Sequence, residues 1–325
     1  MGGGLTAYFT RPHAQSLTPV AVHTVETPVL TTVVQPTEVE PPTLDIAPEP
    51  PPPDSFGSTM RDGLAITGGT PHRLLLFTFD DGPDHRYTPG LLDTLDSLGI
   101  KAVFFLTARR FEGNTPRERL LASIAEDIVR RGHIVGSHTM DHLQLPLLAP
   151  EQLDEQVLGT ERVFERVLGQ RPWLIRPPGG ARSTRVDRWL ASRGYTQMLW
   201  NIGTGDTQVR TSDEVVGTFH RVLARREMDH GERGGVVLLH DIHAWSVEAF
   251  PRIVRDLEER NCTLLEQGEE LYDIVSDPRV FFAARGAAEA SESAPPLMPD
   301  TAWLEARQAR LREQAEVRCT RLAMR

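Results

Sequence analysis

The chain has 325 residues, of which 39% are hydrophobic and 25% charged, and its formal net charge is −10 at pH 7. This composition is ordinary for a soluble protein with one large domain and tails. The negative charge argues against a sequence-independent grip on nucleic acid phosphates or on an anionic membrane surface. The sequence contains no run of about eighteen apolar residues, the length that a membrane span needs, and it does not begin with a standard signal peptide. The two cysteines, Cys262 and Cys319, are too few for a disulfide framework or a cysteine-rich metal site, and they indicate no redox compartment.

Residues 1–70 are rich in Pro, Thr and Val and contain the run Pro48-Glu-Pro-Pro-Pro-Pro53. The charges in this segment are mostly acidic, which favours an extended chain. Such a segment buries too little apolar surface to offset the entropy lost on ordering. We therefore predict an extended, disordered linker before the first domain.

Between residues 71 and 280 short apolar runs alternate with amphipathic stretches. Each run is bounded by turn residues, as expected of parallel strands buried on both faces. The predicted strands are Leu74–Phe79, Ala102–Leu106, His133–Gly136, Trp173–Ile175, Gln197–Trp200, Val236–Leu239 and Thr263–Leu265. Apolar side chains about one helical turn apart, with Pro or Thr-Ser-Asp-Glu at the start, predict helices over Pro116–Arg131, Pro150–Leu168, Thr211–Arg225 and Val247–Arg260.

Seven strands that alternate with helices predict an α/β fold, namely a distorted (β/α)7 barrel similar to a TIM barrel. The alternative, a doubly wound sheet, would have a Gly-rich phosphate turn after its first strand. Asp80-Asp81-Gly82-Pro83 occupies that position, which favours the barrel.

Residues 281–325 return to low complexity and end in a charged stretch that predicts a helix over Thr301–Arg325. A solvated or docked tail helix is the simpler interpretation of this stretch, and a partner-binding element is the alternative.

Polar residues of unusual type follow the predicted strands at their carboxyl ends. In a β/α barrel these ends meet at one face, where the loops form the active site. Residues far apart in the sequence are therefore predicted to be neighbours there, namely Asp80, Asp81, His138, His142, Arg176, Asp206 and His240.

His138 and His142 are four residues apart, so one helical turn or tight loop can point both side chains the same way. With Asp81 from the first loop they make a set of two histidines and one carboxylate. That set leaves positions open for water and substrate, which is typical of a catalytic metal site. His-x-x-x-His alone is a weak signal, and the aspartates at the same face are what favour a divalent metal.

The adjacent aspartates also need an explanation, because like charges side by side are costly unless something compensates them. Side chains of consecutive residues diverge, so Asp81 can hold the metal while Asp80 acts as the base on a water molecule. Arg176 would neutralise and orient Asp80. A solvated Asp-Asp-Gly-Pro turn is the alternative, and the apolar strand before it argues against that interpretation.

His240 ends the apolar strand Val236–Leu239, where a buried structural histidine would be the ordinary interpretation. Its position on the same face as the predicted metal site favours a general acid instead. Asp206 would raise the pKa of His240 and keep the imidazole protonated for donation.

Taken together, the strings Thr78-Phe-Asp-Asp-Gly-Pro83, His138-Thr-x-x-His142, Arg176-Pro-Pro and Leu238-Leu-His240-Asp241 resemble the polysaccharide deacetylase family, also known as the NodB homology domain or carbohydrate esterase family 4. The resemblance covers about 200 residues and leaves both tails outside. It implies that Asp80 is the base, positioned by Arg176, and that His240 is the acid. It further implies a divalent metal, usually zinc and sometimes cobalt or another ion, held by Asp81, His138 and His142.

The chain departs from the family pattern at two motifs. Gly179 stands where the family often has an aromatic residue whose backbone N–H helps to hold the oxyanion, and a backbone donor survives loss of the side chain. The fourth motif is usually Asp-x-x-Asp-Trp, and here Gly203, Asp206 and Thr207 occupy its three defined positions. Asp206 can still tune His240, whereas the missing Trp leaves one wall of the acid's pocket to Trp200 or Trp245.

The resemblance implies a hydrolase that releases acetate from the N-acetyl groups of a GlcNAc-containing polysaccharide, such as peptidoglycan or a chitin-like polymer. Its expected partner is therefore a glycan and not a nucleic acid. Two alternatives remain open: a related amidohydrolase acting on a small or cyclic amide, and a catalytically inactive relative that binds carbohydrate.

A Pro-rich linker of about 70 residues makes sense as a spacer between an enzyme and a membrane, with a reach on the order of 3 Å per residue. The opening Gly-Gly-Gly-Leu-Thr-Ala-Tyr-Phe, followed by Arg11, resembles the end of an apolar span. We therefore expect a signal or anchor helix upstream of Met1 and an extracytoplasmic location, in the periplasm or cell envelope. The alternative is a cytoplasmic enzyme with an extended leader.

Overall fold

The computed structural model describes residues 65–281 and 301–323. The predicted linker up to residue 64 and the low-complexity residues 282–300 lie outside the described residues. The strands are β1 (Ala65–Ile66), β2 (Leu74–Asp80), β3 (Val103–Leu106), β4 (Ile134–Ser137), β5 (Leu174–Ile175), β6 (Thr196–Met198), β7 (Ile202–Gly203), β8 (Gly235–His240) and β9 (Asp273–Ile274). The helices are α1 (Thr88–Ser97), α2 (Pro116–Arg130), α3 (Pro150–Leu168), α4 (Thr184–Ser192), α5 (Ser212–His230), α6 (Ala244–Glu266) and α7 (Thr301–Ala323).

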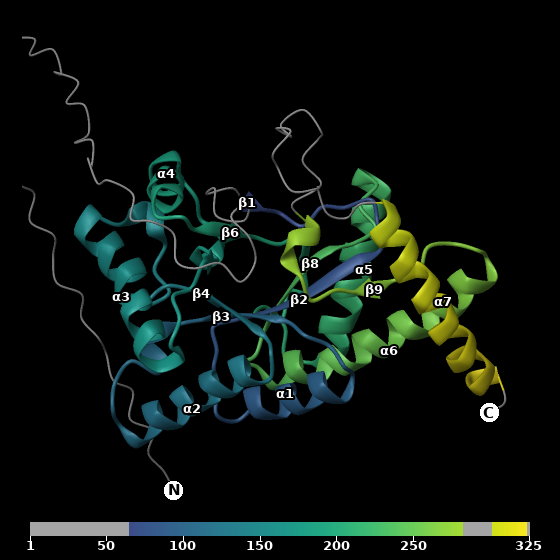
Figure 1. Ribbon diagram of the computed structural model, residues 1–325, viewed down its shortest axis with the longest axis horizontal. Coiled ribbons are helices and arrows are strands. Elements are labelled where there is room, and N and C mark those ends of the chain that lie inside the picture. Colours follow the sequence, from purple (N-terminus) through teal and green to yellow (C-terminus); the bar gives the residue numbers. More distant parts are fainter. Residues whose placement is uncertain (1–64, 282–300, 324–325) are drawn as a thin grey trace, which may run out of the picture. The chain divides into compact units, whose positions relative to one another are not determined.

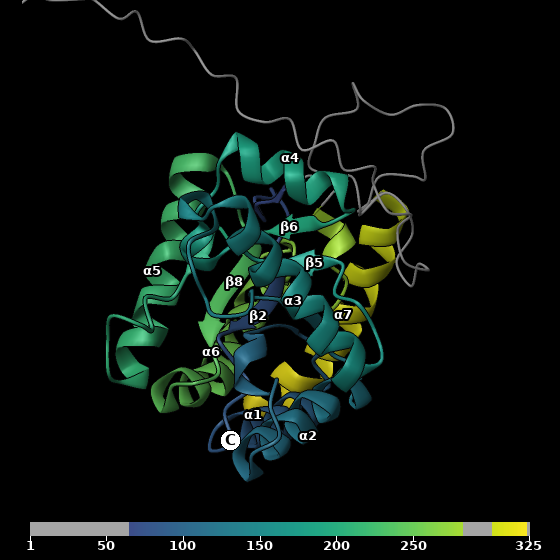
Figure 2. The same ribbon diagram turned by 90° about the vertical axis from the view of Figure 1, so that its left-hand side faces the viewer.

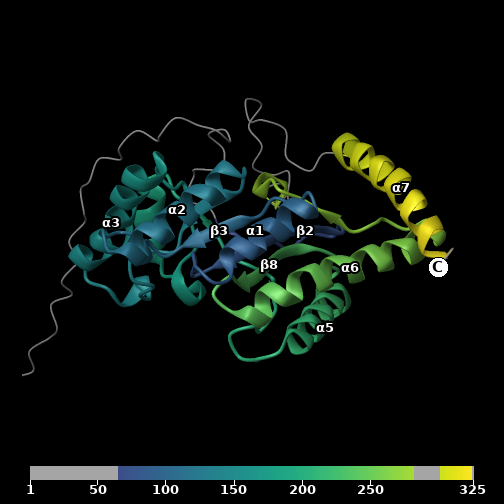
Figure 3. The same ribbon diagram turned by 90° about the horizontal axis from the view of Figure 1, so that it is seen from below.

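The nine strands of the described residues form one parallel sheet in the order β1-β6-β5-β4-β3-β2-β8-β7, and β9 pairs with the start of β2. Helices α1, α2 and α6 cover one side of this sheet (Figures 1 and 3). Strands β2 and β8 run side by side toward the β7 end of this order, with α5 and α6 to one side (Figure 2). The order runs from β1 to β7 without closing on itself, so the fold is the predicted β/α barrel in a distorted, open form.

Strand β2 is buried on both faces, as its continuous apolar sequence predicts. Phe77 and Phe79 point to one face and pack edge-on against Phe250 of α6, at ring-centroid distances of 5.0 and 5.6 Å. Leu76 belongs to a separate hydrophobic cluster. Since side chains alternate along a strand, Asp80 leaves β2 on the face of Leu76, inside the barrel.

One predicted strand is wrong. Thr263–Leu265 lies in the last turns of α6, which runs from Ala244 to Glu266. Leu257 and Leu264 are seven residues apart and both are buried, so this apolar run continues the helical period. A three-residue run is too short to distinguish the two periods from sequence.

Several short elements were not predicted, namely β1, β7, β9, α1 and α4. Strands of two residues are too short to show an alternating pattern. Strand β1 pairs in parallel with β6, so Ala65 and Ile66 belong to the sheet although the sequence assigned them to the linker.

The predicted helix starts agree closely with the structure. Helix α3 has the predicted bounds, Pro150–Leu168. The side chain of Thr211 accepts a hydrogen bond from the backbone N–H of Glu214 and caps α5, as the Thr-Ser-Asp-Glu signal indicated.

The C-terminal helix α7 is docked on the barrel. Cys319 of α7 forms a disulfide with Cys262 of α6, a pairing that the sequence reasoning did not anticipate. Arg307 forms an ion pair with Asp273 of β9, and the Gln308 side chain hydrogen-bonds the backbone near the start of that strand. Within residues 65–281 and 301–323, no helix has both the length and the apolarity that a membrane span needs.

Candidate active site

The register of the sheet brings the polar strand ends together. Asp80 of β2 lies directly opposite His240 of β8. Elsewhere in the same sheet, Ser137 of β4 pairs with Ile175 of β5. The residues that follow these two strands, His138 and Arg176, therefore leave the sheet together. Residues separated by as much as 160 positions therefore meet at one edge, as the barrel topology requires.

Asp81, His138 and His142 form a cluster that could hold a metal ion, because one ligand atom from each lies within 4.8 Å of the others. Asp81 Oδ1 is 3.5 Å from His138 Nε2 and 3.4 Å from His142 Nε2. Ligands each about 2.1 Å from a tetrahedral zinc ion would be separated by about 3.4 Å, so these separations suit such an ion. Asp81 Oδ1 is also buried and finds no hydrogen-bond donor in the described part of the chain, which is costly unless a cation compensates it.

The tautomer of His138 is fixed by its second ring nitrogen. Nδ1 lies 2.7 Å from the backbone carbonyl oxygen of Arg176. A carbonyl can only accept, so Nδ1–H donates and the unprotonated Nε2 faces the cluster. Burial lowers the pKa of His138, which favours the neutral imidazole that binds metals. The side chain of His142 is 46% exposed, so the cluster opens to solvent on this side.

Three non-glycine residues in the two cluster loops have a left-handed backbone: Asp81 (φ 71°), Thr139 (φ 69°) and His142 (φ 58°). This conformation is uncommon for such residues and persists only where the surroundings hold it. The Thr139 hydroxyl accepts a hydrogen bond from the backbone N–H of His142, and the Ser137 hydroxyl accepts one from the N–H of Thr139. Such backbone strain clusters at functional sites.

Asp80 is buried and paired with Arg176. Arg176 Nη1 donates to Asp80 Oδ1 at 2.7 Å and to the hydroxyl of Thr78 at 2.8 Å. Its Nε and Nη2 donate to the backbone carbonyl oxygens of Met198 and Leu199. Burial lowers the pKa of Arg176 and the neighbouring Asp80 carboxylate opposes that shift. The guanidinium is thus held at every nitrogen, and it fixes the carboxylate in one orientation.

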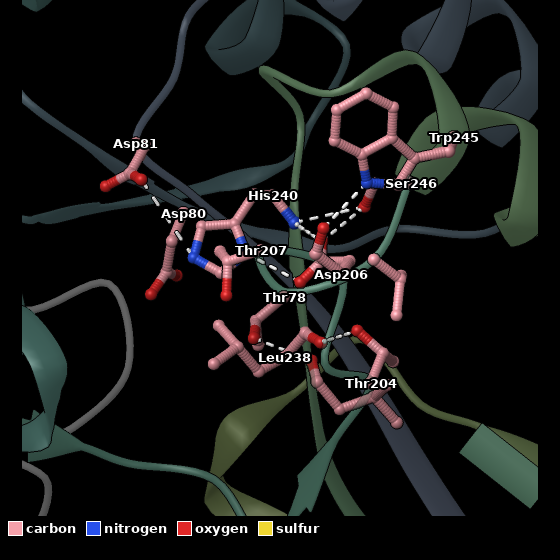
Figure 4. Close-up of polar contacts among 12 residues, drawn as sticks. Thr78, Asp80, Asp81, Thr204, Asp206, Thr207, Leu238, His240, Trp245 and Ser246 are labelled. Carbon is pink, nitrogen blue, oxygen red and sulfur yellow. Dashed lines mark hydrogen bonds and ion pairs between the residues drawn. The ribbon is translucent and has the colours of Figure 1, made fainter. Parts of the chain in front are cut away.

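His240 forms a second pair, with Asp206 (Figure 4). His240 Nδ1 lies 2.9 Å from Asp206 Oδ1, and Asp206 Oδ2 accepts hydrogen bonds from the backbone N–H of His240 and the hydroxyl of Ser246. Burial alone would lower the pKa of His240, but the hydrogen bond and the nearby carboxylates outweigh it and raise the pKa to about 9. Burial alone would raise the pKa of Asp206, and these hydrogen bonds lower it. An imidazolium at neutral pH can donate a proton from Nε2, which faces Asp81 at 3.9 Å.

The remaining predicted residue, Gly179, lies in the short 3-10 turn Pro178–Gly180 that follows β5. Its φ of 63° is in the left-handed region that favours glycine. This turn starts two residues after Arg176, at the same edge as the other residues.

Sequence reasoning gave no role to Thr78 or Ser246, and it named Trp245 only as one of two candidates for the wall of the acid's pocket. Thr78 lies two residues before Asp80 and therefore on the same face of β2, a relation that the period of a strand could have revealed. Trp245 and Ser246 come from the first turn of α6, directly after the loop that follows His240. Of the two tryptophans considered for the acid's pocket, Trp245 contacts Asp206, whereas Trp200 lies over the Arg176 guanidinium at 5.6 Å.

Comparison with known proteins gives concordant matches. Residues 67–198 match the family model described as polysaccharide deacetylase. A peptidoglycan-N-acetylglucosamine deacetylase of Bacillus cereus is 29% identical over 202 residues, which cover 61% of this chain and 88% of that protein. A chitin deacetylase of Pestalotiopsis sp. is 32% identical over 59% of this chain and 61% of its own length. The structure of the chitin deacetylase from the fungal pathogen Colletotrichum lindemuthianum aligns with a TM-score of 0.55 at 25% identity, over 66% of this chain and 89% of that one.

A barrel edge that gathers a possible metal cluster, a buried carboxylate and an imidazole paired with a second carboxylate is equipped to activate water. Together with these deacetylase relatives, it defines a hydrolase that acts on carbon–nitrogen bonds. Residues 67–198 match the polysaccharide deacetylase family, and similarity to the Bacillus cereus deacetylase extends over 61% of the chain. The segment matched by the family model ends before Asp206 and His240, and the structure places these two residues, which the sequence also predicted, beside the rest of the site.

Proposed function

We propose that this protein removes acetyl groups from the N-acetylated sugars of a GlcNAc-containing polysaccharide, peptidoglycan or a chitin-like polymer, and releases acetate. The observation that carries the proposal is the joint placement of Asp80 opposite His240, with the Asp81, His138 and His142 cluster beside them. A water-activating base and a proton-donating acid on either side of a Lewis-acid position are what amide hydrolysis needs.

Asp81, His138 and His142 would hold a divalent metal, and zinc suits a set of two histidines and one carboxylate. When bound, such an ion polarises the acetamide carbonyl and lowers the pKa of water.

In the proposed reaction Asp80 takes a proton from the attacking water, and Arg176 holds its carboxylate in position. The backbone N–H of Gly179 would donate to the oxyanion that forms. His240 then gives its Nε2 proton to the leaving sugar amine, and Asp206 stabilises the charged imidazole. The carbon–nitrogen bond breaks as the amine is protonated, which yields acetate and a free amino sugar.

The test is acetate release from a panel of N-acetylated substrates: peptidoglycan, chitin oligomers, poly-N-acetylglucosamine and small cyclic amides. We expect turnover of at least one GlcNAc polymer, and a rate about 10²- to 10⁴-fold lower for the Asp80→Asn variant. Turnover confined to the small or cyclic amides would instead indicate a related amidohydrolase. Saturable binding of a glycan without any acetate release, in metal-loaded protein, would indicate an inactive carbohydrate-binding relative.

We also propose an extracytoplasmic location, and two features support it. Cys262 and Cys319 form a disulfide, and such bonds persist mainly in oxidising compartments. Residues 1–70 have the composition of a spacer, which suits an enzyme tethered near a polymeric substrate. Fractionation of cells that produce the full-length protein, with alkylation of free thiols before lysis, tests this. A cytoplasmic protein with both cysteines reduced would refute the assignment.

A further inference from the structure

The first turn of α6 contacts Asp206 at two points. Trp245 Nε1 donates a hydrogen bond to the backbone carbonyl oxygen of Asp206 at 2.6 Å. The next residue, Ser246, donates from its hydroxyl to Asp206 Oδ2, also at 2.6 Å. Figure 4 shows the indole beside Asp206 and Ser246 on one side of the His240 ring. The main chain and the side chain of Asp206 are thus both held by neighbouring residues of one helix.

The indole of Trp245 itself contacts two other side chains. The His243 ring stacks on it almost in parallel, with a centroid distance of 4.7 Å and an interplanar angle of 11°. The guanidinium carbon of Arg210 lies 5.1 Å from the ring centroid, within the range of a cation–π contact. An indole with these contacts has little freedom to rotate, so its N–H keeps one direction.

The hydrogen bond matters because Asp206 does not lie on a strand. It belongs to the loop between β7, which ends at Gly203, and α5, which starts at Ser212. A loop of this length is mobile unless its backbone is tied to a rigid element. Trp245 supplies such a tie, since it links the Asp206 main chain to the helix that follows His240.

We propose that Trp245 is a positioning residue for the acid: it fixes the Asp206 main chain so that the carboxylate stays in register with His240. The family motif has a Trp where this chain has Thr207. Trp245 compensates for that missing side chain from a different loop of the barrel. This inference rests on the proposed function for its kinetic consequence. Its structural content, an ordered Asp206–His240 pair, can be tested without activity.

The test compares Trp245→Phe, which keeps an aromatic ring but loses the N–H, with a matched control. Trp189→Phe is the control, because Trp189 also lies under an arginine, Arg193 at 4.3 Å, but on α4. On the best substrate of the panel we expect Trp245→Phe to lower kcat by about five- to tenfold, the range expected for loss of one hydrogen bond. We expect KM and metal content to stay within twofold, and Trp189→Phe to match wild type.

A double-mutant cycle separates positioning from a general structural effect. If Trp245 acts through Asp206, Trp245→Phe should cost nothing further in an Asp206→Ala background. An unchanged kcat in Trp245→Phe, or an equal loss with and without the Asp206 carboxylate, would overturn the proposal.

The readout that does not depend on activity is the Nδ1 proton of His240, observed by NMR in metal-free protein. We expect this proton to be protected in wild type and Trp189→Phe, and to exchange faster with solvent in Trp245→Phe. Equal exchange in all three proteins would overturn the proposal even if wild type had no activity on the panel, and that inactivity would refute only the proposed function.

Discussion

At the scale of single residues, the site depends on two consecutive aspartates that both lie near His138 but differ in their other partners. Asp80 continues the inward face of β2 and contacts Arg176, whereas the left-handed backbone of Asp81 turns its carboxylate toward the two histidines. Neighbouring carboxylates repel unless each has its own compensating charge. The Arg176 guanidinium compensates the charge of Asp80, and a bound metal cation would compensate that of Asp81.

The first prediction separates these two roles. Asp80→Asn keeps the size of the side chain but cannot accept the proton of water, so kcat should fall by about 10²- to 10⁴-fold. Metal content should stay that of wild type, because Asp80 is not in the cluster. Acetate release and metal analysis on the same preparation measure both. A variant within twofold of wild type would assign the base elsewhere.

The second prediction concerns the cluster. Asp81→Ala, His138→Ala and His142→Ala should each weaken binding of a divalent ion, since each removes one of three protein ligands. Dialysis against a chelator should abolish wild-type turnover, and added zinc should restore it. Metal titration of the apo protein by calorimetry measures the affinity directly. Full turnover in chelator, with metal shown to be absent, would contradict the prediction.

The sequence could predict which residue types meet, because their spacing and their position after strands follow from barrel topology. It could not predict how each is held. The tautomer of His138 depends on the Arg176 carbonyl, and the position of Asp206 beside the acid depends on hydrogen bonds from Trp245 and Ser246. These contacts are set by loop conformations and have no periodic signal in the chain.

At the scale of elements, long segments with a clear period were predicted well and short ones were not. Helix α3 has its predicted bounds, whereas the apolar run Thr263–Leu265 continues α6 instead of forming a strand. Strand β1 has two residues and becomes a strand only because β6 offers an edge for pairing. Its formation is a tertiary effect, which local sequence does not encode.

The third prediction concerns α7, which the Cys262–Cys319 disulfide joins to α6 across a sequence separation of 57. Cys319→Ser should lower the free energy of unfolding by about 2–4 kcal/mol, because the unfolded chain regains the entropy of an open loop. Activity at 25 °C on a soluble oligomer should be retained, since no site residue comes from α7. Denaturant unfolding of the variant and of wild type, each with and without reductant, measures the effect.

Two comparisons control for the substitution itself. Cys262→Ser and the double variant should match Cys319→Ser, because each removes the same bond. Reductant should destabilise wild type to the same level and leave the variants unchanged. If the denaturant midpoint of wild-type unfolding is the same with and without reductant, the disulfide does not contribute to stability.

At the scale of the whole molecule, the pH dependence of stability should reflect a histidine outside the site. His133 lies just before β4, it is buried, and its Nδ1 accepts a hydrogen bond from the backbone N–H of Ala102 at 3.2 Å. Burial, aided by the positive charge of Lys101, lowers its pKa from 6.5 to about 4. The folded protein therefore keeps this imidazole neutral at a pH where the unfolded chain already binds a proton.

The sign of the effect follows from that difference. Above pH 6.5 both states are neutral at His133 and the group has no pH dependence, whereas from about pH 6.5 down to about 4 the unfolded state alone takes up the proton. The free energy of unfolding should fall over this window by up to about 1.4 kcal/mol per pH unit, or about 3 kcal/mol in total. Asp241, whose pKa burial raises from 3.8 to about 7, contributes a slope of opposite sign over all of this range.

The fourth prediction compares wild type with a His133 variant, because the contribution of Asp241 is the same in both proteins and cancels in the difference. His133→Asn keeps an acceptor for the Ala102 N–H but cannot titrate in this range, so its stability should depend less on pH than that of wild type. The difference between the two unfolding free energies should shift in favour of the variant as the pH falls from 6.5 to 4, and should be constant above pH 7. Urea unfolding at half-unit pH intervals, with both proteins in the same chelator, measures it. Parallel curves across the whole range would show that His133 is protonated equally in both states, and would contradict the assignment of a neutral, buried imidazole.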